Sequence, residues 1–268
     1  MTTLDAIILG AVQGITEFLP VSSSGHLQLA KELLGVELTQ NLTFDVALHA
    51  GTVCSTLLVL WSEVSKLFKG LFTRHFGESH AYALKIIISM IPVAIVGFTL
   101  KDRLDEMLNA PYALTIVGVM LLLTSLLLTF AYHRSKDSTH IGRPINYRDA
   151  LVIGLAQAFA VMPGLSRSGS TIGMGLIIGN DRSAVAQFSF LMVLVPILGN
   201  TLLDLIKGGG VIAIEGVSSI ALFSGFMTAL IVGALACKAM IEIVKRGKLI
   251  YFAIYCAVVG LVTIIVSF

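Results

Sequence analysis

A polar stretch interrupts the apolar sequence near the amino terminus: GITEFLPVSSSGH, residues 14–26. It contains a carboxylate, Glu17, three consecutive serines, Ser22-Ser23-Ser24, and a histidine, His26. A carboxylate can bind a divalent cation, orient water or act as a general base. A histidine can act as a nucleophile or a general acid. Because Gln13 lies four residues before Glu17, both side chains are expected on one helix face. The stretch therefore has the composition of a reactive site.

A second polar stretch, PGLSRSGST at residues 163–171, also lies between apolar runs. In both stretches an apolar segment resumes after a Ser-Gly pair, so both are expected to present helix N-termini. The unpaired N–H groups and the positive dipole end of such an N-terminus attract anions. Serine hydroxyls add donors, glycines allow close approach of the backbone, and Arg167 supplies a guanidinium suited to phosphate. The residues predicted to bind the anion are Ser22, Ser24, Gly25, Ser166, Ser168 and Gly169.

Each charged or titratable candidate also has a structural interpretation. Arg167 lies in an apolar region, where an unpaired charge is costly, so it is a functional candidate; the alternative is a salt bridge to Glu17. His26 could instead be a helix cap or a hydrogen-bonded residue of the core. Asp45 and His49 form a further pair four residues apart, which lines the same cavity or marks the interfacial end of a helix.

A buried pocket with these groups suits one reaction class. A cation, an anion-binding loop and a nucleophile act together in phosphoryl transfer to water. The fitting ligand is a phosphate or diphosphate attached to a lipid-soluble group, because the pocket is expected to lie within a bilayer.

The composition indicates which kind of fold has to position these residues. Only 13% of the 268 residues are charged, against about 25% in soluble domains, and the mean hydropathy is +0.92. The apolar segments are continuous rather than alternating, which favours helices over a membrane β-barrel. The net charge of +2 gives no indication of nucleic-acid binding. We expect residues 1–268 to form a single all-α integral membrane domain.

Six segments are long and apolar enough to cross the bilayer, which takes about 20 residues. They are residues 44–61, 81–100, 113–132, 184–206, 217–240 and 249–267. Residues 4–35 and 150–179 are also apolar, but Pro, Gly and Ser interrupt each near its middle. Since each half is too short to cross alone, these two regions are predicted to be re-entrant helix hairpins, whose broken backbone must face protein or a water-filled cavity.

The orientation follows from the charges of the connecting loops. Loops 62–80, 133–149 and 241–248 carry more Lys and Arg than the loops that alternate with them. The positive-inside rule places these three loops in the cytoplasm, which puts the first hairpin on the outer side of the membrane.

The two hairpin regions resemble each other at an offset of 144 residues. Ser22-Ser23-Ser24-Gly25 matches Ser166-Arg167-Ser168-Gly169, and Gln13 matches Gln157. Three spans follow each hairpin, so the two copies, residues 1–132 and 145–268, are expected to form an inverted-topology repeat. Such repeats with broken helices place a polar site near the midplane, where the copies meet.

Both polar stretches resemble the signatures of a known family. QGITEFLPVSSSGH, residues 13–26, is similar to the first signature of the bacterial undecaprenyl-diphosphate phosphatases, also known as the bacitracin-resistance phosphatases. PGLSRSGST is similar to their PGxSRSxxT signature. The resemblance covers essentially the whole chain, including the phrase QFSFLMVLVP at residues 187–196. The first signature is written (E/Q)xxxE, with Gln13 at its first position here.

The resemblance implies an inner-membrane hydrolase that removes the terminal phosphate of undecaprenyl diphosphate, giving the monophosphate that carries peptidoglycan precursors. It implies a divalent cation, magnesium or calcium, at Glu17 and Gln13, and a site that opens to the periplasmic side. It also implies that the amount of the protein affects bacitracin sensitivity, because bacitracin binds the diphosphate.

The resemblance further implies roles for individual residues. By position, Glu17, His26 and Arg167 correspond to residues treated as essential in the family, and Ser23 to a serine proposed as its nucleophile. Thr171 ends the second signature and is included among the substrate-binding residues. The nucleophile stays open among Ser23, His26 and a water activated by Glu17.

Two other functions compete with hydrolysis. Inverted repeats with broken helices are transporter architecture, so the same pocket could flip a prenyl phosphate across the membrane. A protein that merely sequesters the lipid would bind it without turnover, but this leaves Glu17 and His26 unexplained. The sequence leaves open the preferred cation, the chain-length selectivity and whether the protein forms a homo-oligomer.

Overall fold

The computed structural model describes residues 1–36, 42–73, 75–100, 107, 112–136, 142–196, 199 and 217–267. These residues form helices joined by turns, without a β-strand among them. The helices are α1 (Thr3–Phe18), α2 (Ser23–Leu33), α3 (Leu42–Val59), α4 (Trp61–Leu71), α5 (Glu78–Thr99), α7 (Ala113–Lys136), α8 (Tyr147–Phe159), α9 (Arg167–Ile177), α10 (Arg182–Met192), α12 (Ser219–Lys245) and α13 (Ile250–Val266). The predicted all-α class is confirmed.

Several helices have the length and composition of membrane spans. Within the described residues, α5, α7 and α12 each qualify, and α3 and α4 qualify together although they are bent by 79° relative to each other. α13 is apolar but has 17 residues. Of the span expected at 184–206, only the first part, including α10, lies within the described residues. The number of six spans stays a prediction.

Large apolar side chains on the outward faces of these helices agree with a lipid environment. Exposed examples are Ile91 and Ile95 on α5, Phe130 on α7, Leu235 on α12 and Val258 on α13. Water-soluble monomers rarely expose extensive contiguous apolar surface. In a bilayer the same side chains face hydrocarbon, so these positions fit a membrane-embedded bundle.

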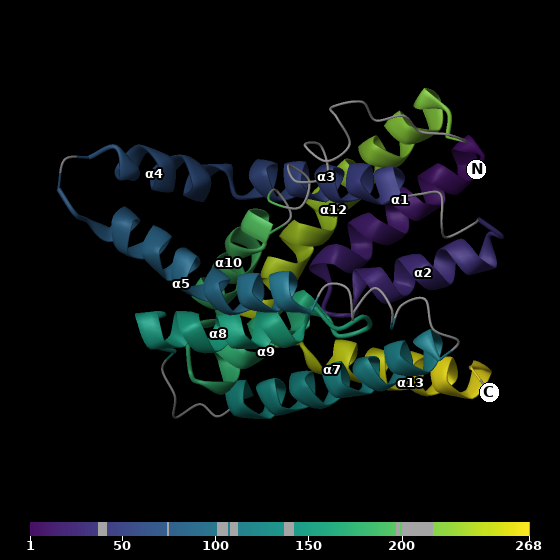
Figure 1. The fold of residues 1–268 in the computed structure, drawn as a ribbon. Coiled ribbons are helices and arrows are strands. Elements are labelled where there is room, and N and C mark those ends of the chain that lie inside the picture. Colours follow the sequence, from purple (N-terminus) through teal and green to yellow (C-terminus); the bar gives the residue numbers. More distant parts are fainter. Residues whose placement is uncertain are drawn as a thin grey trace.

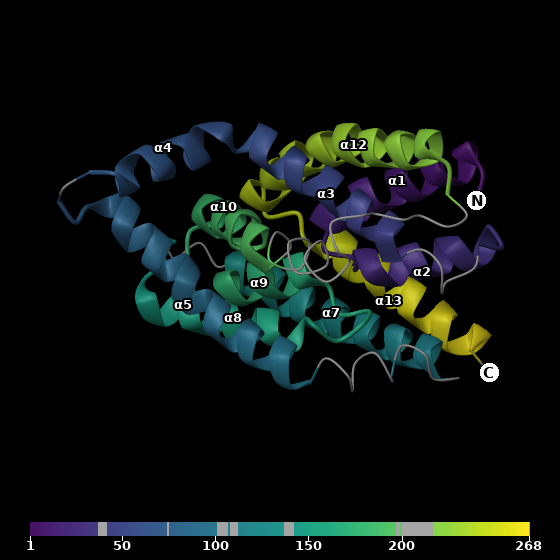
Figure 2. The same cartoon turned by 45° about the horizontal axis from the view of Figure 1, so that its top comes forward.

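The helix α4 departs from the sequence prediction, which expected a loop at 62–80. α4 continues the chain after α3 and carries Glu63, Lys66 and Lys69 together with the exposed apolar residues Trp61 and Phe68. These charges made the segment unlike a membrane span. An amphipathic helix of this kind is stable at an interface, where one face meets apolar groups and the other meets water. Figures 1 and 2 show α4 extending from the bundle, at the end opposite both termini.

The two predicted hairpins are both broken helix pairs, α1–α2 and α8–α9. The first helix of each pair begins with the same capping motif, a capping box. Thr2 and Asp5 form it in α1, and Asn146 and Asp149 form it in α8. A capping box satisfies two of the unpaired N–H groups at a helix start. Because the two boxes lie 144 residues apart, the offset found in the sequence also relates the local structures.

Each hairpin packs closely on a long helix from the other half of the chain. α1 lies against α12, and α8 lies against α5 (Figure 1). Glycines allow the backbones to approach: a Cβ on Gly10 would lie 2.5 Å from the carbonyl oxygen of Gly225, and one on Gly154 would lie 2.4 Å from that of Ser89. Small residues at helix contacts are a common feature of membrane proteins.

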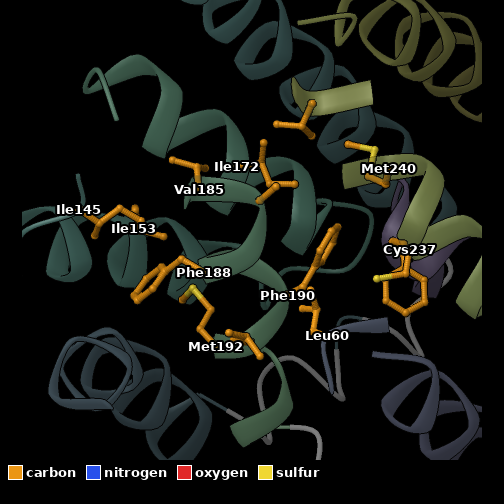
Figure 3. Close-up of a cluster of buried hydrophobic side chains, with 14 of the residues drawn as sticks. Leu60, Ile145, Ile153, Ile172, Val185, Phe188, Phe190, Met192, Cys237 and Met240 are labelled. Atoms are coloured by element: carbon orange, nitrogen blue, oxygen red, sulfur yellow. The ribbon is translucent and has the colours of Figure 1, made fainter. Parts of the chain in front are cut away.

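The larger apolar core lies among α8, α9, α10 and α12 (Figure 3). Phe188, Phe190, Ile172 and Met240 are almost fully buried in it. Phe18, the last residue of α1, packs edge-to-face on Phe190 with ring centroids 5.6 Å apart. This contact ties the end of the first hairpin helix to the core of the second half, directly beside Glu17.

Candidate active site

The breaks in the two hairpins meet each other. The hydroxyl of Ser168 donates a hydrogen bond of 3.1 Å to the carbonyl oxygen of Leu19, which belongs to the break of the first hairpin. On the other side of the contact, a Cβ on Gly169 would lie 3.2 Å from Pro20. Residues 149 positions apart are thereby brought into one site.

The two helix N-termini at these breaks are built in the same way. Ser22 caps α2 by accepting a hydrogen bond from the N–H of Gly25, and Ser166 caps α9 by accepting one from the N–H of Gly169. In each case the capping hydroxyl also lies near that of the serine two residues later, at 3.4 Å for Ser24 and 3.3 Å for Ser168. The structure thus confirms two helix N-termini directed at one region.

Ser22 occupies an uncommon backbone conformation. Among the described residues it is the one non-glycine residue with a positive φ, +72°. Backbone conformations of this kind cost about 1–3 kcal/mol and gather at functional sites. The conformation turns the chain sharply between the break and α2, so that Ser23 in the first turn faces back towards Glu17.

Glu17 is the centre of the polar contacts. Its Oε2 atom accepts hydrogen bonds from the hydroxyl of Ser23 at 2.6 Å and from the Nε2 atom of Gln13 at 3.0 Å. The Nη1 atom of Arg167 lies 3.9 Å from Oε1, and the Nε2 atom of His49 lies 3.9 Å from Oε2. Four residues from four helices therefore surround one carboxylate, whose side chain is only 7% exposed.

Arg167 forms the salt bridge with Glu17 that the structural interpretation expected, but the two side chains are not hydrogen-bonded to each other. At 3.9 Å its contact with Glu17 is too long for a hydrogen bond. Its Nη1 atom is buried and has no hydrogen-bond partner in the part of the chain that the structure describes. A buried donor without a partner is costly, and an anion bound in the site would satisfy it.

A cavity of about 60 Å³ joins these groups. It is lined by Thr16, Glu17, Ser22, Ser23, Ser24, His49, Ala160, Leu165, Ser166, Arg167 and Ser168. A smaller recess of about 20 Å³ is also lined by Glu17 and Arg167, and its wall includes Thr52, Thr56, Thr171 and Ser189. Serines of both hairpins thus line one hollow together with an arginine and a carboxylate.

Residues 6–262 match the family of the bacitracin resistance protein BacA. The chain belongs to this family. Curated relatives carry the name undecaprenyl-diphosphatase. The relative from Bacteroides thetaiotaomicron is 51% identical over 99% of each chain, and that from Parabacteroides distasonis is 52% identical over 98% of each chain. The relative from Halothermothrix orenii is 37% identical over the whole of this chain and 99% of its own.

Most of the predicted site residues of this BacA-family chain lie together, but His26 does not face the cavity. Its Nδ1 atom lies 2.9 Å from the carbonyl oxygen of Ser22, and its Nε2 atom lies 2.7 Å from the hydroxyl of Tyr255. Both ring nitrogens are therefore used within the protein. Thr171 also lies apart from the main cavity: its hydroxyl pairs with that of Ser189 and lines the recess. The glycines Gly25 and Gly169 contribute their N–H groups to the caps.

Two residues near the site stood outside the predicted set. His49 lines the cavity, as the functional interpretation expected of the Asp45–His49 pair, whereas Asp45 is paired with Lys31 at 2.6 Å. Tyr255, on α13, contacts His26 and belongs to no recognisable motif, because it lies in a continuous apolar segment 229 residues away from its partner. Such a contact is a property of the packed fold and not of any local pattern.

The residues Gln13 and Glu17 have a donor set that suits a hard divalent cation. The Oε1 atom of Gln13 is buried and has no hydrogen-bond partner among the described residues, and the Oε1 atom of Glu17 lies 3.9 Å from Arg167. Magnesium and calcium prefer oxygen ligands, and magnesium is often held by one or two carboxylates together with substrate phosphates. Among the described residues, no group of three or more His, Cys, Asp or Glu side chains lies close enough together to hold a metal ion.

Proposed function

We propose that the protein hydrolyses undecaprenyl diphosphate to undecaprenyl phosphate and inorganic phosphate. The observation that carries this proposal is the hydrogen bond between Ser23 and Glu17 beside the Nη1 atom of Arg167, which no described residue hydrogen-bonds, in a cavity walled by two helix N-termini. The undecaprenyl-diphosphatase name of the relatives supports the choice of substrate. The reaction recycles the lipid carrier of cell-wall synthesis and opposes bacitracin, which binds the diphosphate.

Different residues bind the diphosphate and attack its terminal phosphorus. Arg167 and the serine N-termini bind the diphosphate and stabilise the charge that grows on its oxygens in the transition state. Ser23 is the nucleophile: its oxygen attacks the terminal phosphorus, its proton passes to Glu17, and the bridging P–O bond breaks to release undecaprenyl phosphate. Water then attacks the phosphoserine and releases inorganic phosphate. A nucleophile within hydrogen-bond reach of a base is the usual arrangement for such a step.

Glu17 and Gln13 would hold a divalent cation, magnesium or calcium, in this proposal. When bound, the cation would supply positive charge that polarises the phosphate oxygens. Glu17 would then be both a residue that holds the cation and the base for Ser23.

We further propose that six spans and two re-entrant hairpins form an inverted repeat in the bacterial inner membrane, with the site open to the periplasmic side. The capping boxes and the serine caps, repeated at 144 residues, support the repeat. The end of α7, the start of α8 and α4 lie at the end of the bundle opposite both termini (Figure 1), which agrees with the predicted cytoplasmic loops 62–80 and 133–149.

The test is phosphate release from a long-chain prenyl diphosphate by the purified protein in detergent, with magnesium or with EDTA. We expect metal-dependent release that Glu17→Ala and Arg167→Ala abolish. Detergent removes any gradient and any second compartment, so release separates an enzyme from a transporter. A folded wild-type protein that binds the lipid and releases nothing would overturn the proposal in favour of transport or sequestration.

A further inference from the structure

A second cavity lies at the end of α9 that is opposite Arg167. Its volume is about 260 Å³, and it has no lining residue in common with the cavity beside Glu17. The helix α9 runs from Arg167 to Ile177, which is a length of about 15 Å. Leu176, in the last turn of this helix, lines the second cavity. The second cavity is therefore a separate site, one helix length away from the proposed catalytic residues.

Basic side chains from three helices line this second cavity. They are Arg134 of α7, Arg182 of α10 and Lys245 of α12. The acidic residue of the lining is Asp181, whose Oδ1 atom already accepts a hydrogen bond from the N–H of Ala184 as the N-cap of α10. Three positive charges thus face one negative charge that is engaged elsewhere. A concave surface with charge of one sign attracts ions of the opposite sign, so this lining favours an anion.

The guanidinium group of Arg182 is held in place by the backbone around it. Its Nη1 atom donates a hydrogen bond of 3.3 Å to the carbonyl oxygen of Lys245, and its Nη2 atom donates one to the carbonyl oxygen of Ser135. A Cβ on Gly247 would lie 2.8 Å from Nη1, so the glycine leaves room for the guanidinium. Because both acceptors are neutral carbonyl groups, these bonds position the positive charge without cancelling it. The charge is oriented before a ligand arrives, which reduces the entropy lost on binding.

Asn180, in the turn between α9 and α10, adds an acceptor to the same lining. The residue is 4% exposed, and its Nδ2 atom donates a hydrogen bond of 2.9 Å to the Oδ2 atom of Asp149. Because an ionised carboxylate can only accept, this bond fixes which end of the amide carries the oxygen. The Oδ1 atom of Asn180 is buried and has no hydrogen-bond partner among the described residues. A buried acceptor without a partner is costly, and a ligand with a hydroxyl group would satisfy it.

We propose that the second cavity binds a phosphate anion that also carries a hydroxyl group. Arg134, Arg182 and Lys245 donate to the phosphate oxygens, and the Oδ1 atom of Asn180 accepts from the hydroxyl. Hydrogen phosphate has this combination of groups, and so does the phosphoglycerol headgroup of a lipid. In the orientation proposed above, loops 133–149 and 241–248 are cytoplasmic, so this site faces the side of the membrane opposite the catalytic cavity. It binds its ligand independently of the proposed hydrolysis.

The test is equilibrium binding to the purified protein in detergent, in an Arg167→Ala background that weakens anion binding beside Glu17. The probes are inorganic phosphate and short-chain phosphatidylglycerol, with phosphatidylcholine, which lacks the headgroup hydroxyl, as the lipid control. Lys245→Glu reverses a charge in the lining, and Lys248→Glu makes the same change at an exposed position outside it. We expect Lys245→Glu to weaken binding of one probe or both by about tenfold or more, and Lys248→Glu to weaken it by less than about twofold.

The two probes distinguish the sources of the phosphate. A loss confined to inorganic phosphate identifies a soluble anion, and a loss confined to phosphatidylglycerol identifies a lipid headgroup. Equal dissociation constants for Lys245→Glu and Lys248→Glu with both probes would overturn the inference, as would equal affinity for phosphatidylcholine and phosphatidylglycerol without binding of inorganic phosphate. Lys245→Gln, which only removes the charge, repeats the comparison if thermal unfolding shows that Lys245→Glu does not fold. Since no turnover is measured, these constants are decided even if the protein releases no phosphate from a diphosphate.

Discussion

The hydroxyl of Ser23 lies 2.6 Å from the Oε2 atom of Glu17, across the break between α1 and α2. The bend between the two helices brings Glu17 and Ser23 together. In a continuous helix the two residues would be separated along the helix axis. The positive φ of Ser22 belongs to this bend. The reactive pair is therefore a product of the break itself.

Removing either member of the Ser23–Glu17 pair is expected to lower kcat by about 100-fold or more. Ser23→Ala removes the attacking oxygen, and Glu17→Gln removes the base while keeping the shape. Because the two act as a unit, the double variant should fall little further than either single one. Steady-state phosphate release measures this. Thr99→Ala is a control, because Thr99 is exposed and its hydroxyl donates a hydrogen bond to Ile95 of the same helix. Additive losses would contradict a shared step.

Arg167→Lys is expected to lower kcat/KM by about tenfold or more, although the charge is kept. A guanidinium offers several donors in a fixed plane, whereas an ammonium is a point charge on a flexible chain. Kinetics of phosphate release at several substrate concentrations check this expectation. Arg246→Lys, whose 2.8 Å contact with Glu242 lies at an exposed end of α12, should behave as wild type. Full activity of Arg167→Lys would mean that charge alone is needed.

His26 is expected to act by supporting the serine loop through Nδ1 and the carbonyl of Ser22. His26→Ala should therefore lower kcat strongly, while Tyr255→Phe, which leaves that contact in place, should lower it by less than about tenfold. Side-by-side turnover numbers and thermal unfolding of both variants provide the measurement. A loss in Tyr255→Phe as large as that in His26→Ala would instead indicate that Nε2 is the important atom.

The contact between α8 and α5 is expected to be sensitive to one methyl group. Gly154→Ala places a Cβ 2.4 Å from the carbonyl oxygen of Ser89, so the helices must separate, at a cost of about 1–3 kcal/mol. Gly97→Ala in α5 meets nothing within 4 Å and should be neutral or slightly stabilising, because alanine favours helix. Thermal unfolding in detergent compares the two. Equal midpoints would show that this backbone contact contributes little.

The sequence located the breaks well because their causes are local. Pro20 and Pro163 cannot continue a helix, and the Ser-Gly pairs that follow can start one. The resulting helices, α2 and α9, begin at Ser23 and Arg167, as the offset of 144 residues requires. The predicted meeting of the serines with Glu17 and Arg167 is confirmed by the shared cavity.

The direction of individual side chains was harder to predict. The sequence predicts His26 as a catalytic candidate, because Glu17 and the serine stretch lie beside it, yet its ring contacts Tyr255. Which way a ring points depends on partners hundreds of residues away, and a local pattern does not contain them. The helix α4 was missed for another reason: its charges lower its hydropathy, although they leave its helical spacing intact.

The packing of α1 on α12 has a consequence for the order of assembly in the cell. α1 is synthesised first, yet the glycines that receive it, Gly225 and Gly233, are added near the end of translation. Until then α1 lacks the helix on which Gly10 and Gly14 pack, although every residue that lines the cavity has already been made. A chain that stops short of residue 219 would therefore contain both serine caps, Glu17 and Arg167, but not the long helix that supports α1. The insertion of α12 is thus the step that completes the packing of the first hairpin.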